Sequence, residues 1–551
     1  MKSNLYFDVL IISGGASGSA AGIQSARLGA KTLIVEETPW LGGMITSAGV
    51  SAFDGNKYAL GGGIFGELRK KIEDYYGGPE KTFTGWISLT CFEPKVGKDF
   101  LHELAFAERN LTIWFESKLV KVLREKNKIV GAVVKHKDGS EVEIRAQVTI
   151  EATEFGDVLA LGNVPYRLGR EAKNDTGEPH APDNADDEIQ DMTFCAILKK
   201  YKSKAPEVKA AQSYNPEIFE CSTAEDCDNP DETFLNHKLH NWESFITYAA
   251  LPNEKYLLNW PFRANDYLTT RDIYENPSSR EYHFQKAKEQ TLDYIHYIQT
   301  KLGHPEWGLA DDEFPTADAL PFIPYVRESR RIKGVRLMVE EDVIPARNSF
   351  RPPLIKDSIA VGDYFLDHHH SSFFKPPHER LQEKLPANAP FQVSYQSLIP
   401  ETIDGLIAAE KSISVSHIVN GCTRLQPVVM LIGQAAGAAA ALSIIDSVEP
   451  RNINVHTLQN ILLNAGCQLF PYKDVWNNHF DFLAIQYLAL DGVFIDSEDF
   501  SFQPDKVVTD AEAKEFLNKA NSNSTHQDLV GLKRSDAFTR IFNSPKNFQA
   551  S

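Results

Sequence analysis

The sequence lacks the cysteine patterns that build zinc and dithiol redox centres. Its six cysteines are Cys91, Cys195, Cys221, Cys227, Cys422 and Cys467, and no two of them form a CxxC pair. This spacing excludes a zinc ribbon and a thioredoxin-like motif. Cys221 and Cys227 are close enough in sequence to approach each other in a loop. We nevertheless expect reduced thiols, as in an intracellular chain.

Positive charge is also scarce. The 551 residues include 57 Lys and Arg against 75 Asp and Glu, which gives a formal net charge of −18. Proteins that bind nucleic acid concentrate Lys and Arg on one face, and this sequence has no such run. Nucleic acid is therefore not an expected partner.

A secretory signal and a convincing membrane span are missing as well. The segment from Met1 to Phe7 is polar and leads directly into an apolar strand, without the basic and apolar regions of a signal peptide. Residues 425–445 carry no charge, but they are mostly Ala and Gly and include Gln426, Pro427 and Gln434. We expect a buried helix here, no membrane span, and a cytoplasmic protein.

The residues that are present indicate an ordinary globular chain of several packed units. Hydrophobic residues make up 42% and aromatic residues 11% of the sequence. A chain of 551 residues is too long for one hydrophobic core, so two or three units are expected.

The amino terminus predicts a dinucleotide-binding unit. An apolar strand at Phe7–Ile12 is followed by a turn, a small-residue helix at Ser19–Leu28 and a second strand at Lys31–Val35. The turn consists of Ser13, Gly14, Gly15, Ala16, Ser17 and Gly18. Gly15 lets the backbone approach a pyrophosphate, and Gly18 allows the helix to pack closely on the strand. The helix amino terminus attracts phosphate, and Glu36 is placed to bind ribose hydroxyls.

This fingerprint is shared by NAD and FAD, so other segments must distinguish them. Gly42 and Gly43 follow soon after Glu36, in a segment that resembles the one running along the flavin in flavoproteins with two dinucleotide folds. A plain loop after the second strand is the alternative explanation for this glycine pair.

Further blocks extend the resemblance over most of residues 6–445. They are Val148–Thr153 with Gly156-Asp157 and Leu161–Arg167, Leu309–Pro315 with Pro324–Arg331, Asp357–Gly362 with Asp367–His370, and Tyr395 through Leu406–Ala409 to Gly437. The chain resembles bacterial FAD-dependent oxidoreductases distantly related to the flavoproteins of fumarate reductase and succinate dehydrogenase. Two departures stand out: Ala409-Glu410-Lys411 stands where the family more often has Gly-Arg, and Gln396 stands where Arg is common.

The resemblance implies FAD as cofactor and a set of contacts to it. The expected cofactor-binding residues are Ser13, Gly14, Gly15, Ala16, Ser17, Gly18, Glu36, Glu37, Gly42, Gly43, Met44, Ala152, Thr153, Gln426 and Pro427. Gln426 and Pro427 begin the long small-residue helix, whose amino terminus is suited to stabilise the negative charge of reduced flavin. No metal is expected, because the adjacent residues His368, His369 and His370 do not match a ligand spacing.

The expected fold is α/β, with a Rossmann-like FAD-binding domain assembled from both ends of the sequence. Residues 1–160 and 391–445 form this domain, residues 161–390 form an inserted α+β domain that covers the substrate, and residues 446–551 form a helical extension. The strands within Leu111–Ile150 are expected to form a small covering sheet. Residues Leu483–Leu517 resemble one surface-layer homology motif, but a single copy favours an accessory domain over an anchor.

Candidate catalytic residues are His369, His370, His417 and Arg424. Hydride removal beside O–H or N–H needs a base, and histidine titrates near neutral pH. Arg424, just before the long helix, could bind a substrate carboxylate or the flavin anion. Histidines held in structural hydrogen bonds are the alternative explanation.

We therefore predict an FAD-dependent oxidoreductase that acts on a small polar metabolite by hydride transfer, with an unknown electron acceptor. The substrate would be a hydroxyl-bearing sugar derivative or a hydroxy or unsaturated acid. The alternatives are a fumarate-reductase-like reductase of activated double bonds and a non-catalytic, flavin-binding or surface-associated protein. A homo-oligomer is left open.

Overall fold

The first strand, turn and helix of the chain form where the sequence predicts them. The computed structural model describes residues 5–227, 240–260, 263–370, 385–520 and 524–544. Strand β1 (Leu5–Ile12) leads through the turn into helix α1 (Ala16–Arg27), and β2 (Thr32–Val35) pairs with β1 in parallel. Helix α1 begins three residues earlier than expected, so Gly18 lies in its first turn.

The central sheet has seven strands, in the order β3-β2-β1-β6-β5-β4, with β17 also paired to β6. The added strands are β3 (Leu111–Trp114), β4 (Lys118–Glu125), β5 (Lys128–Lys135), β6 (Glu141–Glu151) and β17 (Leu406–Ala408). The expectation of a separate covering sheet was wrong, because β4 and β5 extend the central sheet through antiparallel pairing to β6. Strand β17 comes from the second half of the chain, so both halves build this α/β core.

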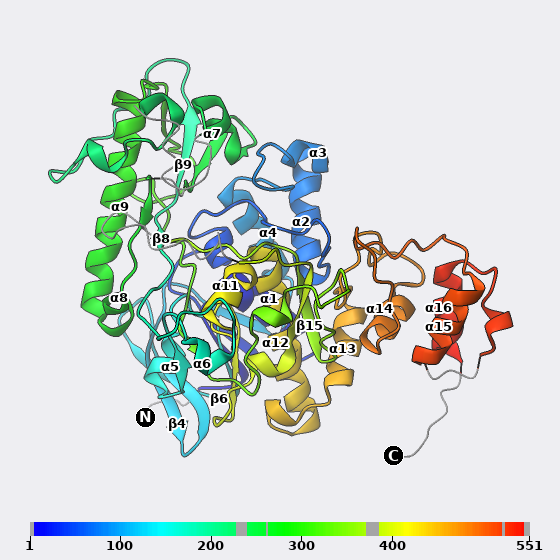
Figure 1. Cartoon of the computed structure of the whole chain (residues 1–551). Coiled ribbons are helices and arrows are strands. Elements are labelled where there is room, and N and C mark those ends of the chain that lie inside the picture. Colours follow the sequence, from blue (N-terminus) through cyan, green and yellow to red (C-terminus); the bar gives the residue numbers. More distant parts are fainter. Residues whose placement is uncertain (1–4, 228–239, 261–262, 371–384, 521–523, 545–551) are drawn as a thin grey trace.

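Helix α12 (Gln426–Asp446) packs directly on α1 in the middle of the molecule (Figure 1). Two glycines permit the close approach: a Cβ on Gly433 would overlap the backbone of Ser17, and one on Gly437 would overlap that of Ala21. The helix is long and apolar enough to cross a membrane by composition, but 89% of its apolar window is buried inside the fold. Burial of this kind is what the sequence predicts for a core helix.

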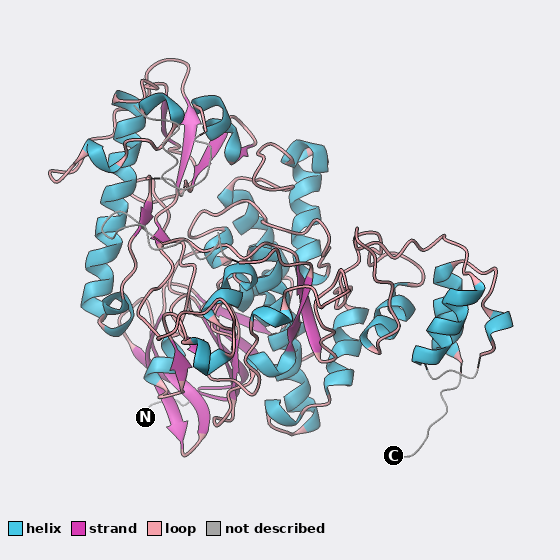
Figure 2. Ribbon diagram, viewed as in Figure 1, coloured by secondary structure: helices cyan, strands magenta, loops and turns pink. Residues whose placement is uncertain are grey.

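Helices α2 (Gly63–Tyr76) and α4 (Pro94–Phe106) contact this pair. The chain also forms α3 (Pro79–Thr82), which packs on α2, and α5 (Asp157–Leu161), which packs on the central sheet. Two more short helices are α6 (Lys173–Thr176) and α11 (His417–Thr423). Figure 2 shows the strands of the central sheet gathered at one end of the molecule, with helices above and beside them.

Part of the segment between β6 and β17, the described residues within 196–309, builds a second region above the core (Figure 1). Its four-stranded sheet has the order β10-β11-β9-β13, and the long helix α9 lies beside it. The bounds are β9 (Ala196–Lys200), β10 (Ala250–Leu251), β11 (Lys255–Leu258), β13 (Trp307–Leu309), α7 (Trp242–Tyr248), α8 (Arg271–Glu275) and α9 (Pro277–Thr300). Short pairs join β8 (Met192–Thr193) to β12 (Asp266–Tyr267), β7 (Tyr166–Arg167) to β14 (Arg331–Ile332), and β15 (Ser358–Gly362) to β16 (Phe391–Ser394).

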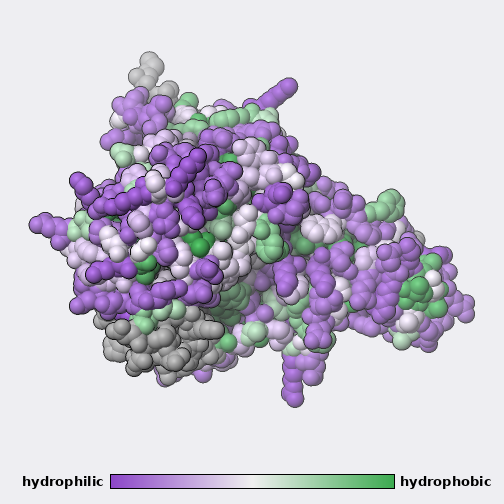
Figure 3. All heavy atoms as spheres, turned by 90° about the horizontal axis from the view of Figure 1, so that it is seen from above, coloured by the Kyte–Doolittle hydropathy of each residue, from purple (hydrophilic) through white to green (hydrophobic). Residues whose placement is uncertain are grey.

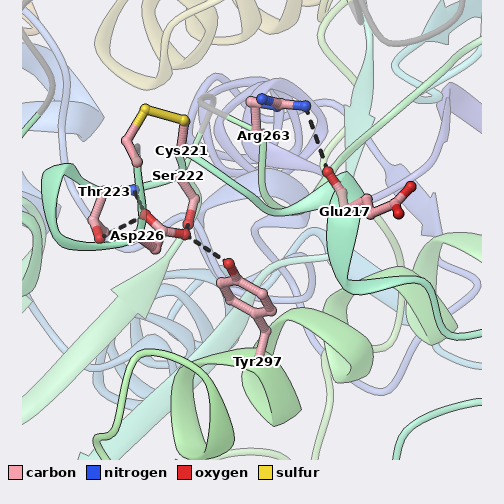
Figure 4. The surroundings of a disulfide bond; sticks show 8 residues. Glu217, Cys221, Ser222, Thr223, Asp226, Arg263 and Tyr297 are labelled. Atoms are coloured by element: carbon pink, nitrogen blue, oxygen red, sulfur yellow. Dashed lines mark hydrogen bonds between the residues drawn. A yellow bond between two sulfur atoms is a disulfide. The ribbon is translucent and has the colours of Figure 1, made fainter. Parts of the chain in front are cut away.

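One disulfide lies in this second region, which corrects the expectation of six reduced thiols. Cys221 and Cys227 are bonded, while Cys91, Cys195, Cys422 and Cys467 are free and buried. Figure 4 shows the bridged loop, in which Asp226 accepts hydrogen bonds from Thr223 and from the hydroxyl of Tyr297 on α9. The loop is therefore tied to α9 as well as to itself.

The chain after α12 forms the predicted helical extension, which projects to the right in Figure 1. It contains α13 (Val455–Asn464), α14 (Phe482–Leu490), α15 (Asp510–Ala520) and α16 (Arg534–Asn543). Helix α15 begins with a capping box: Thr509 N donates to Glu512, and Glu512 N donates to the Thr509 hydroxyl. In the view of Figure 3 the surface is mainly hydrophilic, with small hydrophobic patches, one of them on this extension. The boundaries at residues 160, 390 and 445 stay predictions.

Candidate active site

The glycine turn packs as tightly as the dinucleotide fingerprint requires. A Cβ on Gly18 would overlap the carbonyl oxygen of Ser13, so only glycine fits against the turn. Gly43, in a left-handed conformation with φ of 49°, approaches Gly15 so closely that a Cβ would lie 2.8 Å from its Cα. The two glycine segments that the sequence singled out therefore touch each other above the amino terminus of α1.

Glu36 closes this site from the end of β2. Its carboxylate accepts hydrogen bonds from Gly14 N (2.7 Å), Thr38 N (2.8 Å) and the Ser13 hydroxyl (3.2 Å). Burial raises the pKa of Glu36 to about 7, although these hydrogen bonds oppose the shift. The fold thus holds an acceptor for hydroxyl groups directly against the turn.

A second carboxylate reaches the same turn from the opposite side. Glu410 Oε2 accepts a hydrogen bond from Ser17 N at 2.9 Å, and Glu410 Oε1 accepts one from Lys411 Nζ at 2.8 Å. Lys411 Nζ also donates to Glu154 at 2.6 Å. We call these three residues, Glu154, Glu410 and Lys411, the turn-facing triad.

The amino terminus of α12 meets the loop that follows η1 (Gly43–Ile45). Gln426 accepts a hydrogen bond from Asp54 N at 3.1 Å. The Oδ1 atom of Asp54 is buried and has no hydrogen-bond partner in the part of the chain that the structure describes. Burial raises the pKa of Asp54 to about 7, against the opposing charge of Arg424. This carboxyl group can hold a proton near neutral pH.

Beyond Asp54 lies a buried network of charges. Arg424 donates to Asp367 at 2.7 Å, and Asp367 is 3.0 Å from His369 Nε2. The other ring nitrogen of His369 lies 2.6 Å from Asp266, and Asp266 pairs with Arg327 at 3.0 Å. We call Asp54, Asp266, Arg327, Asp367, His369 and Arg424 the charged cluster.

Opposite charges keep two carboxylates of this cluster, Asp266 and Asp367, ionised, in contrast to Asp54. Burial would raise the pKa of Asp266, but the charges of Arg327 and His369 outweigh it and lower the pKa to about 2. The pKa of Asp367 is held still lower, because the charges of His369 and Arg424 exceed the effect of burial. Each ring nitrogen of His369 lies against a carboxylate, so His369 links Asp266 to Asp367.

A stack of three histidines lies beside the cluster. The ring of His417 is centred 5.1 Å from that of His368 and 5.4 Å from that of His370. His368 Nε2 is 2.9 Å from the carbonyl oxygen of His417, and burial lowers the pKa of His368 to about 3. Both ring nitrogens of His370 are buried without a hydrogen-bond partner among the described residues, and burial lowers its pKa well below the usual range.

His417 has the arrangement of an oriented base. Its Nδ1 lies 3.0 Å from Glu328, while its Nε2 is buried and unpaired within the described ranges. Burial opposes ionisation of Glu328, but its neighbours His417 and Arg331 lower its pKa. A carboxylate on one ring nitrogen fixes the tautomer and leaves the other nitrogen able to accept a proton.

The predicted cofactor-binding residues fall into three groups. One group lies together at the turn and consists of the turn residues with Glu36, Gly42, Gly43 and Met44. Ala152 lies against the turn, and Gln426 and Pro427 begin α12. Thr153 accepts a hydrogen bond from Asp157 N at 2.8 Å, so its hydroxyl caps the following helix. The Glu37 side chain is exposed and lies 3.8 Å from Lys118. All of these assignments stay predictions.

Sequence reasoning missed four acidic residues that organise the site. Asp54, Asp266, Glu328 and Asp367 each contact or surround a predicted catalytic side chain. Two of them carry a local signal that could have drawn attention: Asp367 directly precedes the histidine run, and Glu328 lies within the block Pro324–Arg331. The others come from segments that no spacing rule connects.

A separate cluster could be mistaken for a metal site. Glu93, Asp312 and Glu313 bring carboxylate oxygens within 4.8 Å of one another, which is the one such group among the described residues. Lys255 Nζ lies among them, 2.7 Å from Glu93 and 2.8 Å from Asp312, and also bonds Glu313. An ammonium group therefore already satisfies these carboxylates.

Comparison with known proteins relates the chain to flavoenzymes. The family model described as FAD dependent oxidoreductase matches residues 8–462. Digeranylgeranylglycerophospholipid reductase of Thermoplasma volcanium is 28% identical over 179 residues, and that of Picrophilus torridus is 31% identical over 194 residues. These matches cover 29% and 31% of this chain, and 43% and 44% of the relatives.

The chain thus matches less than half the length of these curated relatives. Among solved structures, a geranylgeranyl bacteriochlorophyll reductase-like protein from Thermoplasma acidophilum aligns with 89% of this chain and 88% of its own. Its sequence identity is 12% and its TM-score is 0.34. A likeness this weak says nothing about the substrate.

Proposed function

Because the chain belongs to the family of FAD-dependent oxidoreductases, we propose that it transfers hydride between FAD and a small polar metabolite. The metabolite is a hydroxyl-bearing sugar derivative or a hydroxy or unsaturated acid. The observation that carries this proposal is the charged cluster beside the amino terminus of α12. Buried charges are costly unless they are paired, so a site beside this cluster favours a polar substrate over a lipid chain.

The described residues fit a bound FAD. The glycine turn, the segment at Gly43 and the carboxylate of Glu36 form a surface that accepts a diphosphate and ribose hydroxyls. The buried hydroxyl of Ser17, the side-chain nitrogen of Gln426 and the Nε atom of Arg424 have no partner within the described chain. Unpaired buried polar atoms along this path indicate a polar ligand. When bound, FAD supplies the hydride acceptor or donor, which no amino-acid side chain provides.

We propose His417 as the general base for oxidation of a hydroxyl group. Glu328 orients its ring, and the unpaired Nε2 can take the hydroxyl proton as the hydride leaves the carbon. His370 lies next to it and is the second candidate, because its ring nitrogens have no hydrogen-bond partner among the described residues, although Nδ1 lies 3.8 Å from Glu188. His369 is held between Asp266 and Asp367, and through Asp367 it positions Arg424. We therefore do not propose His369 as the base.

One observation favours reduction of an activated double bond as a second candidate function. Burial raises the pKa of Asp54 to about 7, so this carboxyl can deliver a proton at neutral pH. The relatives named above are themselves called reductases. In such a reaction Asp54 would protonate one carbon while hydride reaches the other.

The test is an anaerobic spectrum of the holoenzyme with candidate substrates. We expect polyols, sugars or hydroxy acids to bleach the flavin band, and His417→Gln to slow bleaching by roughly a hundredfold or more without loss of flavin. The fall in bleaching rate at low pH, where a catalytic base is protonated, should also disappear in this variant. If no hydroxyl compound bleaches the flavin while fumarate-like acids reoxidise the reduced enzyme, the second candidate replaces the first. If neither the hydroxyl compounds nor the fumarate-like acids react with the flavin, the proposal of a small polar substrate is rejected.

A further inference from the structure

Both terminal nitrogens of Arg424 are bonded to other parts of the protein. Nη1 donates to the hydroxyl of Tyr325 at 2.5 Å, and Nη2 donates to the backbone and carboxylate oxygens of Asp367 at 3.2 and 2.7 Å. The Nε atom of Arg424 has no partner within the described residues, but a single N–H cannot form the two-pronged contact by which arginine binds carboxylates. Asp367 therefore already takes the place of a substrate acid on this side chain.

Arg327 is bonded in the same way. Nη1 donates to the backbone oxygen of Asp191 and to the hydroxyl of Thr193, both at 2.8 Å. Nη2 donates to Asn259 at 3.1 Å and lies 3.0 Å from Asp266. Each arginine of the charged cluster is thus matched by an ionised aspartate. A substrate anion would have to displace one of these carboxylates or stay buried without a counter-charge.

The unpaired buried atoms beside the proposed base are suited to hydroxyl groups. Among the described residues they include Oδ1 of Asp191, Oδ1 of Asn420, Nε2 of Gln190 and Nε2 of His417. Gln190 Oε1 and Asp191 N bond the backbone of His369 at 3.4 and 2.8 Å. The side-chain amide of Asn420 donates to the backbone oxygen of Arg327 at 3.1 Å. These acceptors and amide donors lie against the charged cluster, and a hydroxyl group can bond to either kind.

Two carboxyl groups of this region hold a proton near neutral pH. Burial raises the pKa of Asp54 to about 7 and that of Asp191 well above its usual value. A protonated carboxyl both donates and accepts a hydrogen bond, as a hydroxyl group does. When Asp54 ionises, it repels an acid but still accepts a hydrogen bond from a hydroxyl group. Both states of Asp54 therefore favour an uncharged partner.

Resting on the oxidation proposed above, we propose that the substrate is an uncharged polyhydroxyl compound, a sugar or polyol, and that hydroxy acids and unsaturated acids are excluded. Asp367 and Asp266 close the two arginines to acids, while the unpaired groups beside His417 receive hydroxyls. In the reaction, the oxygen of one hydroxyl group loses its proton to His417 Nε2 and its carbon loses hydride to FAD, which leaves a carbonyl group.

The test compares matched neutral and acidic compounds on the holoenzyme, by anaerobic bleaching of the flavin. The pairs are lactamide with lactate, sorbitol with gluconate, and methyl glucoside with methyl glucuronide. In each reactive pair the neutral member should bleach the flavin roughly a hundredfold faster or more at equal concentration, because the acid leaves a buried charge unpaired. Equal or faster bleaching by the acids would overturn this inference and leave the proposed oxidation standing. If no member of the pairs bleaches the flavin, the proposed oxidation fails and this inference fails with it.

A variant that frees one arginine sharpens the test. Asp367→Ala removes the carboxylate from Arg424, so the preference for the neutral compound should fall by roughly tenfold or more. Asp404→Ala is the matched control, because it removes a carboxylate from Arg451 in η6 (Pro450–Asn452), at the amino-terminal end of β17, and should leave the preference unchanged. An unchanged preference in folded Asp367→Ala would contradict the exclusion of acids by Asp367. The comparison on the parent protein decides the substrate class whether or not this variant folds.

Discussion

The glycine turn and the charged cluster are both buried and both surround the proposed cofactor site, but they are assembled in different ways. The turn takes its residues from 13 to 18 and its closing carboxylate from Glu36, all within one strand-helix-strand unit. The charged cluster takes six side chains from segments between Asp54 and Arg424, which only the tertiary fold brings together. The first is a steric fit of backbone to backbone, and the second is a balance of charges.

This difference decides what each region tolerates. A backbone fit fails when any side chain is added, whatever its chemistry. A balanced cluster tolerates changes of shape but fails when one charge is removed, because its partner is left buried and unpaired. The following predictions test this contrast, beginning with the largest expected effect.

Gly18→Val should break the turn. The added side chain would overlap the Ser13 carbonyl oxygen, so we expect a loss of about 3 kcal/mol or more in the free energy of unfolding, together with loss of bound flavin. Flavin content and urea unfolding measure both effects. Gly66→Ala in α2 is the matched control, because no atom lies within 4 Å of the added Cβ, and it should be neutral or slightly stabilising. Full flavin content in Gly18→Val would show that the turn is not a steric fit.

Asp367→Asn should break the charge balance without changing shape. The substitution leaves His369 and Arg424 without their shared carboxylate, and should cost about 3–5 kcal/mol of unfolding free energy. Asp311→Asn removes a carboxylate that is 72% exposed and paired with Lys199, and should change stability by less than about 1 kcal/mol. Chemical denaturation compares the two. Equal effects would mean that the charges of the cluster are not coupled.

Asp54→Asn should change how stability depends on pH. Asp54 has a folded pKa of about 7 against an ordinary value of 3.8, so between these pH values the folded chain keeps a proton that the unfolded chain has lost. Stability therefore falls as pH rises through this window, by up to about 4 kcal/mol in total. Asparagine does not titrate, so the unfolding free energy of the variant should rise relative to that of the parent from pH 5 to pH 8. A difference in unfolding free energy that is the same at both pH values would contradict the raised pKa.

The turn could be read from the sequence, and the cluster could not. Strand, glycines, helix and Glu36 lie within 30 residues, so this pattern predicted the fold class and a bound dinucleotide. The resemblance over residues 6–445 implied FAD, and the family match confirms both. The hydrogen bonds of His369 to Asp266 and Asp367 depend on how the second region packs on the core, so the histidine could be found but its role could not. The strands β4 and β5 were placed wrongly for a related reason. Their hairpin pattern is local, but the sheet that receives them is set by pairing with β6.

The Cys221–Cys227 bridge has a practical consequence for mass spectrometry. Neither Lys nor Arg occurs between the two cysteines, so trypsin releases both on one peptide, lighter by two hydrogen atoms when the bridge is present. A glutamate-specific protease cuts after Glu225, between them, and yields two fragments that separate only after reduction. Because such bridges persist mainly in oxidising compartments, peptides from the native host would report where the protein resides.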